Sequence, residues 1–308
     1  MFFDSRSAIE ASAAQKTERD IVNNPSPVLN RPSPQEGNAS ATIIALHCSL
    51  GSGRQWSRLV EDAGTRHRVI APDISGYGAA QGAAGLPKTL AQEAEFLSDA
   101  LAAATGPIHL VGHSYGGAIA LKLATASPLA MRVLSLTLIE PVLPTMLLDD
   151  AADRPLYEEF FRLGHDVFLD LWRDVPGDAL DKFLDYWKGS EPPEELPPKM
   201  RARMIEQVQK LAYEFTALFA EDHVATAAAS IDVPTLLYSG GLSPAMTQRI
   251  ASRLASIVPG IETRHLPSAG HMLAISHADT INTEILKHIA AAERAANRSS
   301  PMQHSSRS

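Results

Sequence analysis

Cysteine is almost absent from this chain of 308 residues, which contains only Cys48. A single thiol cannot form a disulfide within the chain, so the fold must depend on a packed core. The lack of disulfides fits a reducing compartment, and the opening MFFDSRSAIEASAAQ lacks the long apolar segment of a secretory signal. We therefore expect a cytoplasmic protein.

Long apolar runs and excess positive charge are also missing. No run approaches the roughly 20 apolar residues of a membrane helix, so we expect no membrane association. Lys and Arg total 27 against 35 Asp and Glu, which gives a formal charge of −8 at pH 7. Because an acidic surface does not favour phosphate backbones, we expect no nucleic-acid partner. The sequence has no phosphate-binding loop, dinucleotide fingerprint or metal-ligand spacing, so we expect no cofactor and no metal.

Short apolar runs alternate with helical patterns through most of the chain. The runs are typical of strands buried on both faces of a parallel sheet, and they occupy residues 41–48, 67–73, 107–114, 132–141, 235–241 and 261–267. Helical spacing follows at residues 86–104, 116–127, 243–257 and 277–296. This alternation predicts an α/β fold with a doubly wound, mostly parallel sheet.

Three segments depart from the alternation. Residues 1–40 and 294–308 are rich in polar and small residues, and we expect a flexible N-terminal arm and a flexible C-terminal tail. Residues 142–228 carry helical patterns and six of the nine Phe residues. We expect this segment to be a helical insertion between two core segments, 41–141 and 229–293.

A serine stands at the junction between the third strand and its helix. The sequence Gly112-His113-Ser114-Tyr115-Gly116 matches G-x-S-x-G, a sharp turn in which side chains at the glycines would clash with backbone. The turn would hold the Ser114 hydroxyl above the sheet, near the N–H groups of the following helix. The alternative is a glycine-rich turn with an incidental serine.

With this motif the chain resembles the α/β-hydrolase fold family over about residues 41–290. LHCSLGSGRQW resembles the family's oxyanion loop, APDISGYG the loop after its next strand, and SAGHM its catalytic histidine loop. Cys48 departs from the usual glycine after His47, and the usual first strand pair is not evident before residue 41. The resemblance implies that residues 142–228 form a cap over the serine.

A serine nucleophile requires a base and oxyanion donors. His271 follows the last strand in a Gly-containing loop, at the sheet edge where functional loops gather; it could instead cap the following helix. The Tyr115 N–H is the expected first oxyanion donor. The resemblance implies that Ser49 supplies the second, with Leu50 as the near alternative.

The acid that should orient the histidine is missing from its usual place. TLLYSGGLSPAM, residues 235–246, contains no Asp or Glu, and Ser243 stands where most relatives carry the acid. Glu140 ends the preceding strand, and its place in the chain keeps the order nucleophile, acid, histidine. It could instead hold the entry to the insertion, and Asp222 is a second choice. We predict a Ser114–His271–Glu140 triad.

The predicted function is hydrolysis of a small, apolar carboxylic ester or related acyl bond through an acyl-enzyme. Leu50, Tyr186 and Trp187 are candidate substrate contacts. A carbon–carbon bond hydrolase of the same fold and a non-catalytic ligand-binding relative remain alternatives. Family members with an Asp nucleophile, such as haloalkane dehalogenases, are excluded by the serine. The partner is a small molecule, and the oligomeric state is left open.

Overall fold

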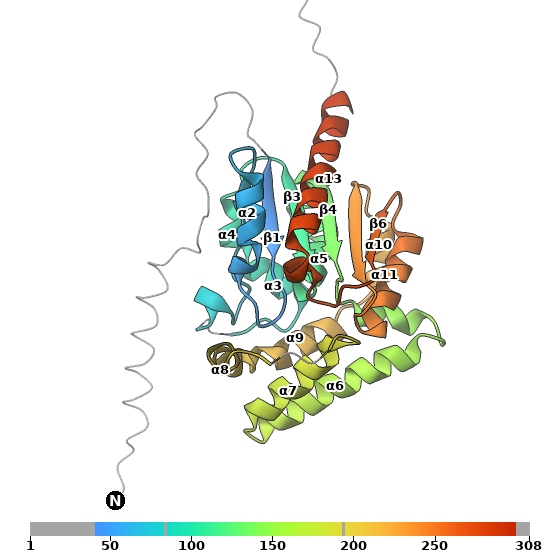
Figure 1. The fold of residues 1–308 in the computed structure, drawn as a ribbon. Coiled ribbons are helices and arrows are strands. Elements are labelled where there is room, and N and C mark those ends of the chain that lie inside the picture. Colours follow the sequence, from blue (N-terminus) through green and yellow to red (C-terminus); the bar gives the residue numbers. More distant parts are fainter. Residues whose placement is uncertain (1–40, 83–84, 193–194, 300–308) are drawn as a thin grey trace, which may run out of the picture.

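A single parallel sheet organises the chain. The computed structural model describes residues 41–82, 85–192 and 195–299. Within these ranges six strands pair in the order β2-β1-β3-β4-β5-β6, and every neighbouring pair is parallel (Figure 1). The strands are β1 (Thr42–Leu46), β2 (Arg68–Ile70), β3 (Ile108–His113), β4 (Val133–Ile139), β5 (Thr235–Gly240) and β6 (Glu262–Leu266). The predicted α/β fold with a parallel sheet is confirmed.

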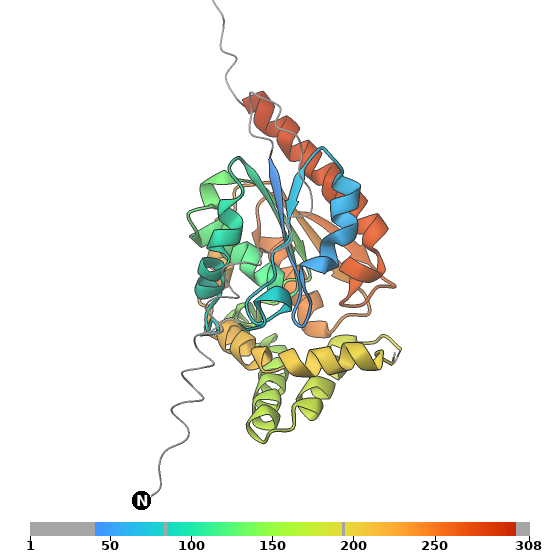
Figure 2. The ribbon, with the colours of Figure 1, turned by 90° about the vertical axis from the view of Figure 1, so that its left-hand side faces the viewer.

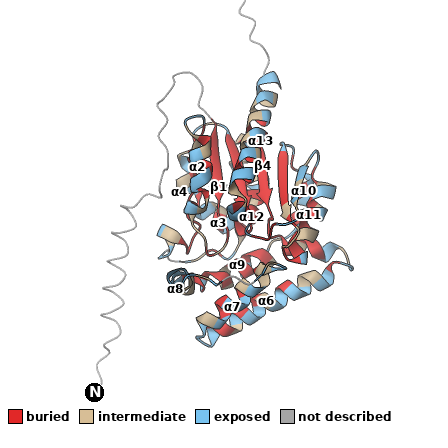
Figure 3. Ribbon diagram, in the orientation of Figure 1, coloured by how far each residue is buried: buried red, intermediate tan, exposed pale blue. Residues whose placement is uncertain are grey.

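Helices cover both faces of the sheet, which explains the continuous apolar runs of its central strands. Figure 2 shows α2 and α13 on one face and α3 to α5 on the other. The helices around the sheet are α2 (Ser57–Ala63), α3 (Leu90–Phe96), α4 (Ser98–Ala102), α5 (Tyr115–Ala126), α11 (Ala245–Ile257), α12 (Leu273–Ser276) and α13 (Ala278–Ser299). β1 and β3 are buried along their whole length, whereas the edge strand β6 is largely exposed (Figure 3).

Several strands end at the same edge of the sheet. The register pairs Leu46 with Gly112 and His113 with Ile139, so β1, β3 and β4 finish side by side. The next residues in the chain are those of the predicted site, including Ser114 and Glu140. The short 3₁₀ turns η1 (Gly53–Trp56), η2 (Gly78–Ala80), η3 (Ala130–Arg132) and η4 (Pro144–Asp149) lie in the connections.

The described part of the segment between β4 and β5 contains helices and connecting loops but no strand. The helices are α6 (Arg154–Trp172), α7 (Pro176–Lys188), α8 (Pro198–Gln207), α9 (Lys210–Phe219) and α10 (Val224–Ala229). Figure 1 shows α6 to α9 gathered below the edge at which the strands end. Their aromatic side chains pack on one another around buried Phe160. The centroid of the Phe160 ring lies 5.2 Å from that of Phe215 and 5.9 Å from that of Trp187.

The helix boundaries differ from the sequence pattern in three places. The pattern over 86–104 divides at Leu97 into α3 and α4, and α2 was not predicted at all. α13 continues past residue 294 to Ser299, because the Ala-rich stretch there favours a helix. The expected N-terminal arm and residues 300–308 lie outside the described residues.

None of the helices in the described ranges is both long and apolar enough to cross a membrane.

Candidate active site

The turn at Ser114 has the strained geometry that its glycines predict. Ser114 has φ 57° and ψ −120°, between the end of β3 and the start of α5. A Cβ on Gly112 would lie 2.4 Å from the carbonyl oxygen of Gly116, and a Cβ on Gly116 would lie 2.5 Å from the carbonyl oxygens of Leu46 and His47. Only glycine fits at these two contacts, and the close packing fixes the position of Ser114 against the loop after β1.

Three predicted residues form a continuous hydrogen-bonded chain. His271 Nε2 lies 2.9 Å from Ser114 Oγ, and His271 Nδ1 lies 2.7 Å from Glu140 Oε2. Because a carboxylate can only accept, Nδ1–H donates to Glu140, which leaves Nε2 of the neutral ring to accept from the serine hydroxyl. The exposed fractions are 3% for Ser114, 3% for His271 and 0% for Glu140.

Glu140 is held in its ionised form chiefly by His271, with a further hydrogen bond from the end of β5. Burial raises the pKa of Glu140, but the hydrogen bond from His271, the charge of that ring when it is protonated and the Gly240 N–H outweigh it and hold the pKa below its usual value. The Gly240 N–H donates to Glu140 Oε1 at 2.6 Å. Ser243 stands at the usual acid position, but its buried hydroxyl makes no hydrogen bond within the described residues, and the carboxylate comes from the neighbouring strand β4. The alternative acid, Asp222, is exposed.

The loop after β1 contributes two of the predicted residues. Leu50 is buried and has φ 56°, and the Ser49 hydroxyl donates to Glu214 Oε2 at 2.6 Å. Tyr115 is the first residue of α5, where backbone N–H groups have no partner within the helix. Its side chain turns away from the serine, and the phenol donates to Glu93 Oε1 at 3.1 Å.

A chain of polar contacts that has no signal in the sequence joins this loop to the histidine loop. The Cys48 N–H donates to Gln55 Oε1 at 3.1 Å, and Gln55 Nε2 lies 3.1 Å from His113 Nδ1. His113 Nε2 lies 2.8 Å from the carbonyl oxygen of His271. Burial lowers the pKa of His113 to about 3, so its ring is neutral. It therefore accepts from Gln55 and donates to the carbonyl oxygen of His271, so its contacts hold the histidine loop rather than the serine.

A second group that the sequence analysis missed is a set of buried charges from the insertion. α9 carries Lys210 and Glu214 against the core, and Lys210 is paired with Glu93 of α3. Lys210 also donates to Ser75 Oγ at 2.9 Å. Charged residues at helical spacing usually face solvent, so their spacing alone could not reveal this burial.

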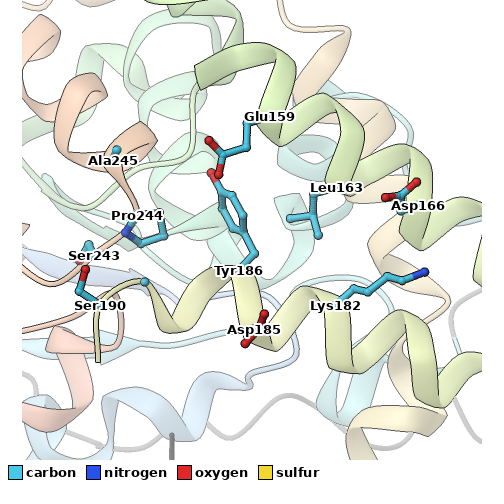
Figure 4. Close-up of a pocket in the computed structure, with 11 residues that line it drawn as sticks. Glu159, Leu163, Asp166, Lys182, Asp185, Tyr186, Ser190, Ser243, Pro244 and Ala245 are labelled. Carbon is cyan, nitrogen blue, oxygen red and sulfur yellow. The ribbon is translucent and has the colours of Figure 1, made fainter. Parts of the chain in front are cut away.

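The two predicted aromatic contacts of α7 point to different places. The Trp187 indole stacks on the His271 ring, with 4.1 Å between centroids and 22° between planes. Tyr186 lines a cavity of about 580 Å³ between α6, α7 and the loop before α11, where its ring points toward Glu159 (Figure 4). Ser243 borders this cavity too, whereas Ser114 and His271 are not part of its lining.

Metal ligands do not gather in the described part of the chain: no group of three His, Cys, Asp or Glu side chains there could hold an ion. Cys48 is buried, and burial raises the pKa of its thiol to about 12, so this residue is a neutral packing element.

Comparison with known proteins identifies the family to which the chain belongs. A haloalkane dehalogenase from Mesorhizobium japonicum is 25% identical over 269 residues, covering 82% of this chain and 85% of the relative. The solved structure of a hydrolase from Pseudomonas aeruginosa PA01 has a TM-score of 0.64 at 21% identity, covering 82% of this chain and 92% of that one. That of the carboxylesterase CesB from Bacillus subtilis has a TM-score of 0.61 at 19% identity, covering 84% and 86%.

These likenesses show the shared fold across most of each chain. A family model described as the alpha/beta hydrolase family matches residues 43–284, which include Ser114, Glu140 and His271. This chain therefore belongs to the alpha/beta hydrolase family.

Proposed function

We propose that the protein hydrolyses a small carboxylic ester or related acyl bond through an acyl-enzyme on Ser114. The observation that carries this proposal is the chain from Ser114 Oγ to His271 at 2.9 Å and from His271 to Glu140 at 2.7 Å. Nucleophile and base are within proton-transfer distance, and the base is oriented by a buried carboxylate.

The first step follows from the tautomer of His271. Its Nε2 takes the hydroxyl proton as Ser114 Oγ attacks the acyl carbon, and the Glu140 carboxylate stabilises the imidazolium that forms. Nε2–H then gives the proton to the departing alcohol oxygen as the ester bond breaks. Water attacks the acyl-enzyme by the same route and releases the acid.

The negative oxygen of the tetrahedral intermediate needs donors on the side opposite the histidine. The Tyr115 N–H, at the positive end of α5, and the Ser49 N–H are the proposed pair. Donors fixed in this way lower the barrier by several kcal/mol, because they do not have to reorganise during the reaction. The close approach of Gly116 to Leu46 and His47 supports this pairing, since it brings the two backbones together.

Residues 142–228 serve in this proposal as a cap, with 41–141 and 229–293 as the catalytic core. Trp187 supports this role because its indole covers the histidine ring. With Ser114 only 3% exposed, substrate entry requires the cap helices to shift. Trp187 and Leu50 are the proposed apolar contacts of the substrate beside the nucleophile, and Tyr186 would contact the part of a substrate that extends into the neighbouring cavity.

Dehalogenation, the activity named for one relative, is a weaker candidate. A carboxylate nucleophile forms an ester with the substrate carbon that water can then hydrolyse. A serine in the same position would form an ether, which water does not cleave under these conditions. The carboxylesterase CesB is one similar protein whose named chemistry fits a serine at this turn.

Two measurements test the proposal. A fluorophosphonate should label Ser114 of the folded protein and should leave Ser114→Ala unlabelled. Rates on p-nitrophenyl esters of increasing acyl length should then exceed those on dioxo ring-cleavage products. Failure of wild-type protein to label would favour a ligand-binding protein, and faster turnover of the dioxo compounds would favour a carbon–carbon bond hydrolase.

A further inference from the structure

Glu214 is a buried carboxyl group that the proposed mechanism does not use. It comes from α9 and is only 3% exposed. Its Oε2 accepts from the Ser49 hydroxyl at 2.6 Å, so the carboxyl group lies directly against the proposed oxyanion loop. Its Oε1 has no hydrogen-bond partner among the described residues.

The nearest cation does not neutralise this group fully. Lys210 lies one helical turn earlier on α9, but its ammonium is already paired with Glu93 and bonded to Ser75. One lysine thus stands against two buried carboxyl groups. Burial raises the pKa of Glu214 to about 7, against the opposing effects of Lys210 and of the Ser49 and Tyr77 hydroxyls.

A second unpaired polar group lies beside it. The Tyr77 hydroxyl is completely buried and makes no hydrogen bond within the described ranges. It lies beside Glu214 and favours the ionised carboxylate, but the contact between the two groups does not reach hydrogen-bond geometry. A buried acceptor and a buried donor are therefore both unsatisfied at one place, and leaving both unpaired is costly.

We infer that Glu214 and Tyr77 form a polar subsite that binds a hydroxyl group on the acyl part of the substrate. A hydroxyl both donates and accepts, so it can donate to Glu214 Oε1 and accept from the Tyr77 phenol. An ammonium group could satisfy only the carboxylate. The subsite makes the protein selective for esters of hydroxy acids over the plain acyl esters.

The position of the subsite fixes where the hydroxyl must be. This step rests on the proposed function, because it takes the Ser49 N–H as an oxyanion donor. The Ser49 backbone nitrogen and Glu214 Oε2 are joined through one serine side chain and a 2.6 Å hydrogen bond, so they lie no more than about 6 Å apart. A hydroxyl one or two carbons from the carbonyl spans that separation, whereas a hydroxyl in the leaving alcohol would lie on the other side of the acyl carbon.

Matched ester pairs test the inference. We would measure kcat/KM for the p-nitrophenyl esters of lactate and propionate, and of 3-hydroxybutyrate and butyrate, each divided by the hydroxide-catalysed rate of the same ester. Wild-type protein should prefer the hydroxylated ester of at least one pair about tenfold, the usual effect of a hydrogen bond to a charged group. Tyr77→Phe and Glu214→Leu should bring this ratio close to one while still hydrolysing the plain ester.

The control is Tyr238→Phe, which removes another buried and unpaired phenol, from β5. It should leave the ratio unchanged. A wild-type ratio near one, or a preference that survives in both Tyr77→Phe and Glu214→Leu, would overturn the inference.

Failure of the proposed function would be recognised separately, as absence of fluorophosphonate labelling and of hydrolysis of all four esters. In that case calorimetry with Ser114→Ala decides the inference, using the anilides of the same four acids. Tighter binding of the hydroxylated anilide, lost in Tyr77→Phe, supports the subsite, and equal binding rejects it.

Discussion

At the scale of single residues, backbone strain is concentrated where the chemistry is proposed. Five non-glycine residues in the described ranges have positive φ, and three of them, Leu50, Ser114 and Glu140, border the candidate site. Each such residue costs on the order of 1 kcal/mol or more. The packing around them, including the close contact at Gly116, offsets that cost and holds the hydroxyl and the carboxyl group in place.

Replacing Glu140 tests the least expected member of the proposed triad. Glu140→Gln should fold, because the amide oxygen can still accept from Gly240, but kcat/KM should fall by about four orders of magnitude as control of the His271 tautomer is lost. Asp222→Asn is the matched control, since Asp222 is exposed, and its kinetics should equal those of wild type. Near-normal turnover in Glu140→Gln would remove Glu140 from the mechanism.

The raised pKa of Glu214 predicts how stability depends on pH. A group that binds its proton more tightly in the folded protein stabilises the fold at low pH, and this contribution is lost as pH rises toward the folded pKa of about 7. Between pH 4.5 and pH 7 the loss reaches about 3 kcal/mol or less. Glu214→Gln should not lose stability in this way, because its amide does not ionise.

Urea unfolding of wild type and Glu214→Gln at pH 5, 6, 7 and 8 measures this effect. The difference in free energy of unfolding between the two proteins removes the contribution of the groups that titrate in both. This difference should shift in favour of the variant as pH rises. A difference that is constant with pH would show that Glu214 titrates in the same way in the folded and unfolded protein.

At the scale of elements, the strands and the serine turn could be predicted because their signals are local. Each strand is a short apolar run, and the turn is defined by five consecutive residues. Glu140 could be placed because it ends a strand beside that of the serine, although the family's usual position, near Ser243, carries no acid. The placement of Glu140 next to His271 agrees with the predicted partnership, while its catalytic role stays a prediction.

Other parts of the site depend on contacts between distant segments and have no local signal. The Gln55–His113 connection joins residues 58 positions apart, and the Ser49–Glu214 hydrogen bond joins residues 165 apart. α2 was missed for a different reason: it has seven residues, too few for a clear period. The break at Leu97 likewise occurs within a sequence of good helix formers.

The position of α7 makes a prediction about access to the serine. Because the Trp187 indole covers the His271 ring, Trp187→Ala should raise the second-order rate of Ser114 labelling by a bulky fluorophosphonate several-fold. Trp172→Ala is the control, since that indole is 77% exposed on α6, and its labelling rate should not change. Thermal unfolding of both variants separates access from loss of structure. Slower labelling of a folded Trp187→Ala protein would mean that the indole orders the site instead.

At the scale of the whole molecule, a few buried or partly buried polar contacts attach the insertion to the core. Asp153 at the start of α6 accepts from Arg249 at 2.6 Å and from Arg253 at 2.7 Å, both on α11. The Ser190 N–H donates to the Leu242 carbonyl oxygen at 2.7 Å. The pair of Lys210 with Glu93 is the most deeply buried of these contacts. The insertion is thus fixed to both sides of the site.

Removing one partner of the buried Lys210–Glu93 pair should destabilise the protein more than replacing both partners by neutral residues. Lys210→Met leaves Glu93 buried without its cation and should lower the free energy of unfolding by about 3 kcal/mol or more. Adding Glu93→Gln should recover part of that loss, because no uncompensated charge remains. Urea unfolding of the two single variants and the double variant measures the coupling, and additive losses would contradict it.

The most direct test of the central claim is the mass of the protein caught during turnover. Wild type quenched in acid while hydrolysing a p-nitrophenyl ester should carry one acyl group, and fragmentation should locate it on Ser114. Ser114→Ala should carry none and should not turn over the ester. Hydrolysis by Ser114→Ala at the wild-type rate, with no acyl group found on either protein, would contradict the account.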